Sequence, residues 1–147
     1  MSSDRGKPID FEVIKEPWLV YQLKDNTKLK TRYILTRLFK KIQEKKAVYN
    51  FDGQTITVVL ISPELKGPTD NRKYSNQELQ QSIIQQEVKY DVISEEWNEY
   101  YADDGTKIRM KATVTDVKKT DKHDVEGQPI YMVDTNVLLQ IKPPKTD

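Results

Sequence analysis

The sequence predicts a mainly β protein, made of two related antiparallel units packed about a pseudo-twofold axis as a sandwich or a pair of small barrels. Three observations lead to this prediction. One stretch of the chain recurs 79 positions later, apolar and polar residues alternate along both copies, and only one segment has the signature of a helix. Alternation with a period of two is typical of half-buried strands.

The repeat aligns residues 11–40 with residues 90–119 without a gap, and 10 of the 30 aligned positions are identical. Such a repeat defines the architecture before any single element is considered. The identical pairs are Val13/Val92, Ile14/Ile93, Glu16/Glu95, Trp18/Trp97, Tyr21/Tyr100, Asp25/Asp104, Thr27/Thr106, Lys28/Lys107, Thr36/Thr115 and Lys40/Lys119.

The repeat divides the chain into a first β unit at residues 8–62, a linker at residues 63–85 and a second β unit at residues 86–142. Each unit has about 55 residues, and a unit of that size buries little apolar surface by itself. We therefore expect the two units to share one core as a single compact domain. Both a monomeric pseudo-dimer and a homo-oligomer are compatible with this arrangement.

Each unit is expected to begin with two short strands and a tight turn. Ile9–Ile14 alternates apolar and acidic side chains, and residues 88–92 repeat the alternation. The second strand holds a Trp-x-x-Tyr motif, at residues 18–21 and 97–100. Asp25-Asn26 and Asp104-Gly105 then predict hairpins with type I′ turns, because Asn and Gly tolerate positive φ angles.

A long strand follows each turn, from Lys28 to about Lys40 in the first unit and from Lys107 in the second. One face of each strand is mainly apolar, so it should face the core. The other face is basic in both copies. Its residues are Lys28, Lys30, Arg32, Lys107, Arg109 and Lys111.

A second match pairs residues 52–59 with residues 126–133, at a shift of 74. Both segments are interpreted as a turn, at Asp52-Gly53 and Glu126-Gly127, followed by a returning strand. This alignment gives the first unit five extra residues, around Lys40–Val48. The second unit is expected to end with a strand at Val137–Ile141.

The linker predicts one helix. Ser75 and Glu78 have the spacing of a capping box, so a short helix is expected over Asn76–Gln85. Leu79 and Ile83 would share one of its faces. We expect this helix to pack on the joint between the two units.

Composition excludes several classes of protein. The chain has no cysteine, which rules out disulfides, thiolate nucleophiles and iron–sulfur clusters. Its longest apolar stretch, near Thr57–Ile61, is far shorter than the roughly 20 residues of a membrane span. The polar N-terminus lacks the apolar core of a signal peptide. We therefore expect a soluble, cytoplasmic protein with no membrane partner.

Charge is unevenly distributed although the net charge is only +1. Residues 1–62 carry 12 basic and 7 acidic side chains, a net charge of +5, whereas residues 86–147 carry 9 and 13, a net charge of −4. Either the surfaces of the two copies have diverged freely, or the halves attract each other or engage different partners.

No catalytic residue, cofactor or metal site is predicted. His123 is the single histidine and has carboxylates close by in residues 121–126. A metal-dependent hydrolase at this place is the least favoured hypothesis, because a charged, flexible turn is a poor cage for a metal ion. Adjacent carboxylates on strands point to opposite faces, and no glycine-rich phosphate-binding motif is present.

The basic strand faces are the candidate site for nucleic acid or another anion. Two symmetric stripes of cations would contact phosphates, with nearby aromatic rings stacking on bases. The alternative is that these faces are simply solvated and keep strands from aggregating. The aromatic residues with the same spacing in both copies are expected to be core anchors. They are Trp18, Tyr21, Trp97 and Tyr100.

The pattern Trp97-x-x-Tyr100-x-x-x-Asp104-Gly105-Thr106-Lys107 resembles short prokaryotic all-β proteins that carry one such unit. The resemblance covers residues 86–142 and, more loosely, residues 8–62, where Asn26 replaces the glycine. It implies that single-unit relatives pair as homodimers and that this chain encodes such a pair. It implies no activity.

Without a catalytic constellation, the sequence favours a protein-interaction or structural accessory module. Exposed edges of paired β units can accept a strand from a protein partner. Weak nucleic-acid binding without sequence specificity, through the basic strand face, is the alternative hypothesis.

Overall fold

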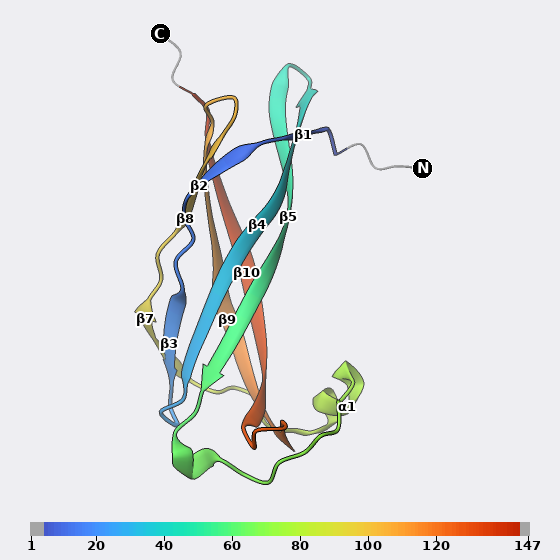
Figure 1. Cartoon of the computed structure of the whole chain (residues 1–147), viewed down its shortest axis with the longest axis vertical. Coiled ribbons are helices and arrows are strands. Elements are labelled where there is room, and N and C mark those ends of the chain that lie inside the picture. The colour runs from blue at the N-terminus through green and yellow to red at the C-terminus, as the bar shows by residue number, and fades with distance from the viewer. Residues whose placement is uncertain (1–4, 145–147) are drawn as a thin grey trace.

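The computed structural model describes residues 5–144 and confirms a mainly β protein, with two antiparallel sheets (Figure 1). The first sheet has the order β1-β4-β3-β7, with β5 paired along β4, and the second has the order β10-β9-β8-β2, with β6 paired to β9. The strands are β1 (Lys7–Ile9), β2 (Phe11–Lys15), β3 (Leu19–Leu23), β4 (Lys28–Gln43), β5 (Lys46–Leu60), β6 (Ile83–Gln85), β7 (Tyr90–Ser94), β8 (Asn98–Ala102), β9 (Lys107–His123) and β10 (Pro129–Lys142).

Each sheet contains one strand from the other half of the chain. β2 lies in the first half of the sequence but pairs with β8 in the second sheet, and β7 pairs with β3 in the first sheet. In Figure 1, β1 and β2 form one continuous segment that passes from the first sheet to the second. Neither sheet is therefore complete without a strand from the other half.

The strand registers of the two halves repeat at the offset of 79 positions. Tyr21 of β3 is opposite Val92 of β7, and Tyr100 of β8 is opposite Val13 of β2. The pairing of β3 with β4 repeats in the pairing of β8 with β9 in the same way. The arrangement of β3, β4 and β7 is thus matched by β8, β9 and β2. Descent of both halves from one copied unit stays a prediction.

The long hairpins β4–β5 and β9–β10 also correspond, but not at the shift of 74. Thr31 is opposite Thr57, and Met110 is opposite Leu139. Because Thr31 and Met110 are equivalent in the repeat, β5 and β10 correspond at a shift of 82, the separation of Thr57 and Leu139. A β-bulge interrupts both hairpins at the same repeat position.

The predicted turn at Asp52-Gly53 is wrong, because this dipeptide lies within β5. The β4–β5 turn is formed by Glu44 and Lys45, whose φ angles are 51° and 66°. The extra residues lie in the second half, since β9 and β10 are joined by residues 124–128. The match of residues 52–59 with residues 126–133 depended on a dipeptide typical of turns. The register of β4 and β5 instead follows from the alternation of side chains along two strands of about 15 residues.

The turns after β3 and β8 lie where the sequence predicts them, but they are not type I′. Only Asn26 and Gly105 have positive φ angles, of 69° and 85°. The N–H of Asn26 donates to the carbonyl of Leu23 at 3.0 Å, and the N–H of Gly105 donates to that of Ala102 at 2.9 Å. A type I turn followed by one left-handed residue explains both contacts.

Two clusters of buried side chains lie between the sheets, and each draws on both halves of the chain. Burying either cluster therefore requires both sheets. One contains Tyr33, Leu35, Leu38, Tyr100, Ala102, Ile108, Met110 and Ala112. The other contains Leu19, Tyr21, Leu23, Leu29, Val88, Val114 and Val117.

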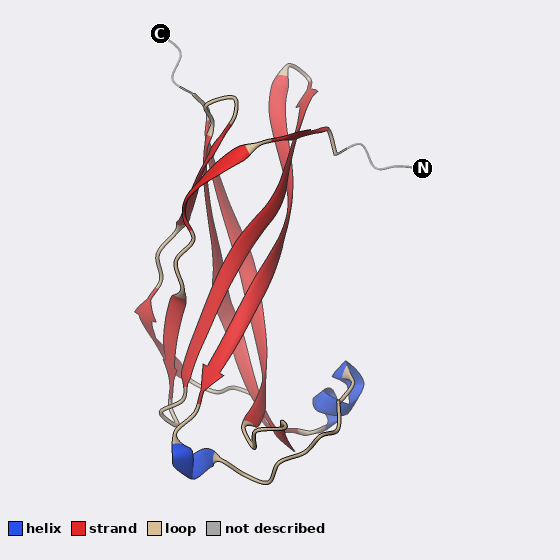
Figure 2. Cartoon of the chain, viewed as in Figure 1, coloured by secondary structure: helices blue, strands red, loops and turns tan. Residues whose placement is uncertain are grey.

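The linker contains the expected helix and a shorter one. Helix α1 (Asn76–Gln81) has the predicted capping box, but it ends early because Ile83–Gln85 pairs with β9 as β6. A 3₁₀ helix, η1 (Pro63–Leu65), precedes it. Figure 2 shows α1 beside one end of the second sheet and not at the joint between the halves. Within residues 5–144, no helix is long and apolar enough to cross a membrane.

Candidate functional site

The basic residues of β4 lie on the outer face of the first sheet, and those of β9 lie on the outer face of the second. Burial alternates along both strands, so that Leu29, Thr31 and Tyr33 are buried while the residues between them are partly or fully exposed. We call Lys28, Lys30 and Arg32 the first basic row, and Lys107, Arg109 and Lys111 the second basic row.

The two tryptophans lie beneath these rows and not in the buried clusters. Trp18 and Trp97 are half-buried, whereas Tyr21 and Tyr100 are fully buried. The Lys30 ammonium is 4.9 Å from the centre of the Trp18 ring. The reason is strand alternation: the residue after each tryptophan points into the core, so the tryptophan points outwards and its ring attracts cations.

Two of the three cations of the second basic row, Lys107 and Lys111, contact carboxylates, whereas Arg109 donates to the side-chain oxygen of Gln140. Glu99 accepts contacts of 3.3 Å from both Lys107 and Lys15, and Glu95 lies 3.2 Å from Lys111. The hydrogen bond from Lys107, followed by that from Lys15, lowers the pKa of Glu99. Glu99 therefore remains ionised and compensates the charge of Lys107, as Glu95 does for Lys111.

The first basic row lacks the carboxylate that Glu99 provides in the second. Val20 occupies the repeat position of Glu99, so it offers no carboxylate to Lys28 or Lys30. Among the described residues, neither of these lysines has a carboxylate within 4.0 Å. Arg32 alone has one, at 3.9 Å from Glu16. Lys28 and Lys30 thus form an uncompensated pair of cations on the first sheet.

Apolar side chains of β5 flank this pair of cations. Leu60, Val58 and Ile56 are opposite Lys28, Lys30 and Arg32, on the same outer face. Half of Leu60 is exposed, and 38% of Ile56. In the second sheet the same positions hold Lys142, Gln140 and Leu138. The first sheet is therefore the more apolar of the two beside its basic row.

The side of β5 that faces away from β4 is an open sheet edge. At the turn between β3 and β4, the N–H of Leu23 donates to the carbonyl of Thr27 at 2.8 Å, so Thr27 bonds towards β3. Along an antiparallel strand, successive residues direct their backbone hydrogen bonds to opposite sides. Lys28, Lys30 and Arg32 therefore bond to β5, and their partners on β5 are the even-numbered residues 60, 58 and 56. The N–H and C=O groups of residues 55, 57 and 59 therefore point to the open side.

Arg5 contacts the adjoining part of β5, at Phe51 and Asp52. Its guanidinium donates to the carbonyl of Phe51 at 3.1 Å and to the Asp52 carboxylate at 2.7 Å. No described strand pairs with the open side of residues 53–60, which contain neither charge nor proline. We call residues 53–60 the open edge of β5.

Two further polar clusters join the sheets, and sequence reasoning missed them. Asp104 accepts hydrogen bonds from Lys40 at 2.6 Å and from Tyr49 at 2.5 Å. Asp25 accepts one from Tyr131 at 2.5 Å. The sequence did hold one indication of these clusters, because Asp25 and Asp104 are identical residues at equivalent positions of the repeat. Each cluster satisfies its carboxylate within the protein, so both are structural clamps between a turn and the opposite sheet.

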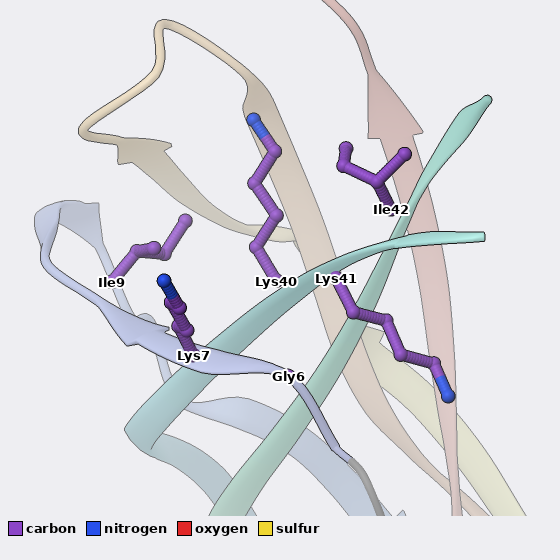
Figure 3. A pocket seen from close by; sticks show the side chains of 6 residues that line it. All are labelled: Gly6, Lys7, Ile9, Lys40, Lys41 and Ile42. Atoms are coloured by element: carbon purple, nitrogen blue, oxygen red, sulfur yellow. The ribbon is translucent and has the colours of Figure 1, made fainter.

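A hollow of about 510 Å³ lies between β1 and the end of β4, lined by Gly6, Lys7, Ile9, Lys40, Lys41 and Ile42. Figure 3 shows that the side chain of Lys41 points away from those of Lys7 and Lys40, and Lys40 is bound to Asp104. The three ammonium groups do not converge on one ligand. In residues 5–144, no group of three or more His, Asp or Glu side chains is placed to hold a metal ion. The hypothesis of a metal site at His123 receives no support.

No family model, curated protein or solved structure matches the chain.

Proposed function

We propose that the protein is an interaction module that receives an extended segment of a protein partner at the open edge of β5. The observation behind the proposal is a run of eight uncharged residues, 53–60, on an edge strand whose outward backbone groups have no partner strand in the described chain. Natural edge strands are usually protected by charge, proline or short length. An unprotected edge is suited to strand addition.

The neighbouring surface supports the same proposal. An added strand would place alternate side chains beside Ile56, Val58 and Leu60, which are at least partly exposed. Cross-strand side-chain contacts stabilise a sheet, and backbone hydrogen bonds supply affinity. The open edge thus offers both kinds of interaction to one ligand.

Replacing Thr57 by proline tests the proposal. This change removes an N–H that points to the open side and leaves the β4–β5 hydrogen bonds in place. Nuclease-treated native lysate passed over the wild-type protein should yield a protein partner that Thr57→Pro fails to retain. Thr57→Val keeps the backbone donor, so it should bind as the wild type does. Leu139→Pro, at the equivalent position of β10, controls for the edge of the second sheet.

Two results would refute the proposal. In one, Thr57→Pro retains the same partner as the wild type. In the other, nuclease treatment removes everything that the protein captures. Circular dichroism of each variant verifies that the sheets are intact before binding is compared.

A second candidate function is weak binding of single-stranded nucleic acid, favoured by the uncompensated charges of Lys28 and Lys30. Affinity for a labelled oligonucleotide would then fall steeply with salt, and charge reversal of the first basic row would abolish it. The structure is less favourable to base stacking, because cations already occupy a face of the Trp18 ring. Unchanged binding after reversal would dismiss this candidate.

A further inference from the structure

We propose that the partner strand is amphipathic, with acidic side chains on the face next to the first basic row and aliphatic side chains on the opposite face. This inference rests on the proposed function and adds the chemistry of the ligand. It follows from a comparison of the two sheets, which have the same strand registers but differ in charge compensation and in the residues of their edge strands.

The second sheet shows how the first cation of a basic row is balanced within this fold. Glu99 of β8 lies beside the second basic row and contacts Lys107 at 3.3 Å. In the first sheet, β3 has Val20 at that position, so Lys28 and Lys30 have no such neighbour. The missing carboxylate can come from the other side of β4, from a strand added beyond β5.

The distance from β4 to an added strand suits lysine. Neighbouring strands are about 4.8 Å apart, so a strand beside β5 would lie roughly 10 Å from β4. Lys28 and Lys30 can extend their flexible four-carbon stems over Leu60 and Val58, their neighbours on β5. Glutamate side chains of the added strand, extending in the opposite direction, would complete the ion pairs above this apolar surface.

The other face of the added strand would meet the interior of the sandwich. Val59 is opposite the buried Leu29 and packs against one of the core clusters. Side chains of the added strand next to Thr55, Thr57 and Val59 would extend that apolar contact. The two faces together predict a strand in which acidic and aliphatic residues alternate.

Other occupants fit less well. A second copy that paired through its β10 edge would place Asn136, Leu138, Gln140 and Lys142 on the outer face, and none of these is acidic. Single-stranded nucleic acid would supply negative charge, but Leu60, Val58 and Ile56 are aliphatic and give bases no ring on which to stack.

Fluorescence anisotropy with two synthetic peptides tests the inference. The probes are fluorescein-labelled nonapeptides, one alternating Glu with Val and the other alternating Lys with Val. The wild-type protein should bind the Glu–Val peptide more tightly than the Lys–Val peptide. The double variant Lys28→Glu/Lys30→Glu should weaken Glu–Val binding roughly tenfold and strengthen Lys–Val binding.

The matched control is Lys107→Glu/Arg109→Glu, which makes the same charge change on the second sheet and should leave Glu–Val binding at the β5 edge nearly unchanged. Thr57→Pro should abolish binding of both peptides.

If the wild type binds both peptides equally and Thr57→Pro abolishes both, strand addition stands and acidic selection is overturned. If Thr57→Pro has no effect, or if neither peptide binds, the proposed function itself fails. An oligonucleotide that displaces the Glu–Val peptide, binds independently of Thr57→Pro and is lost on charge reversal would assign the row to nucleic acid instead.

Discussion

The hydroxyl of Tyr100 donates a 2.8 Å hydrogen bond to a carboxylate oxygen of Glu16, and so joins the second sheet to the segment between β2 and β3. The same oxygen accepts the N–H of Leu35 on β4, at 3.1 Å. Tyr21 and Glu95 make the reciprocal contact at 2.7 Å. The two sheets are thus joined by two equivalent contacts, each between a buried tyrosine of one half and a glutamate of the other.

Replacing Tyr100 by phenylalanine should lower the free energy of unfolding by about 2 kcal/mol, because it removes a buried hydrogen bond to a charged group. Urea denaturation followed by tryptophan fluorescence measures the change. Tyr101→Phe, whose side chain is 44% exposed, is the control and should change stability by less than about 0.5 kcal/mol. Equal effects of the two substitutions would show that the Glu16 contact contributes nothing.

The raised pKa of Tyr21 should make the protein lose stability in alkali. Burial, followed by the hydrogen bond to Glu95, raises the pKa of Tyr21 to about 12, above the usual value near 10. The folded state therefore holds this proton more tightly than the unfolded state. The associated stability is complete below pH 10 and is lost as the pH rises towards 12. Tyr21→Phe should be less stable at pH 8 but should flatten the decline of stability between pH 10 and pH 12, as urea titrations at each pH would reveal. A slope that survives the substitution must come from other groups.

Strand alternation made most of the fold predictable, because it is a local signal that the repeat presented twice. The faces of β4 and β9 follow directly from it, and so does the outward direction of both basic rows. The exchange of β2 and β7 between sheets was not predictable. β3 and β8 occupy equivalent positions in the repeat, and alternation does not tell which of them β2 joins. In the structure, the single residue Asp10 connects β1 of the first sheet to β2 of the second.

Only part of the candidate site could be predicted from the sequence. The replacement of Glu99 by Val20 can be read at the shift of 79, but its importance depends on knowing that β3 and β8 lie beside the basic rows. The apolar flank on β5 was hidden by the false match at Asp52-Gly53, which placed a turn within the strand. Trp18 was assigned to the core because a shared position suggested packing, whereas alternation with Leu19 places it outside.

The lowered pKa of Asp104 should make the protein lose stability in acid. Although burial by itself would raise its pKa, the hydrogen bonds from Lys40, Tyr49 and Thr106 lower it well below the usual range. Its contribution is therefore present above about pH 4 and is lost as the pH falls through the lowered value. Asp104→Asn should reduce stability at pH 7 and make the decline between pH 4 and pH 2 shallower. Thermal unfolding across that range measures both effects. Asp103→Asn, at the exposed neighbouring position, is the control.

Gly53 gives a test of the corrected strand register. A β-carbon at this position would overlap the ring of Tyr33 and lie 2.7 Å from the carbonyl oxygen of Ile34. The second half has the opposite distribution of size: at the repeat positions of Gly53 and Tyr33 it has Thr135 and Ala112. The glycine is thus needed because the tyrosine fills the space above it.

Gly53→Ala should therefore destabilise the protein by about 1–3 kcal/mol through overpacking, although alanine forms strands at least as readily as glycine. Denaturation midpoints in urea measure the loss, with the exposed Gln54→Ala as control. If Gly53 lay in a surface turn, as the sequence match at a shift of 74 suggests, the ring of Tyr33 would not press on it. Wild-type stability for Gly53→Ala would then show that β5 does not lie in the register that places its open edge beside Lys28 and Lys30.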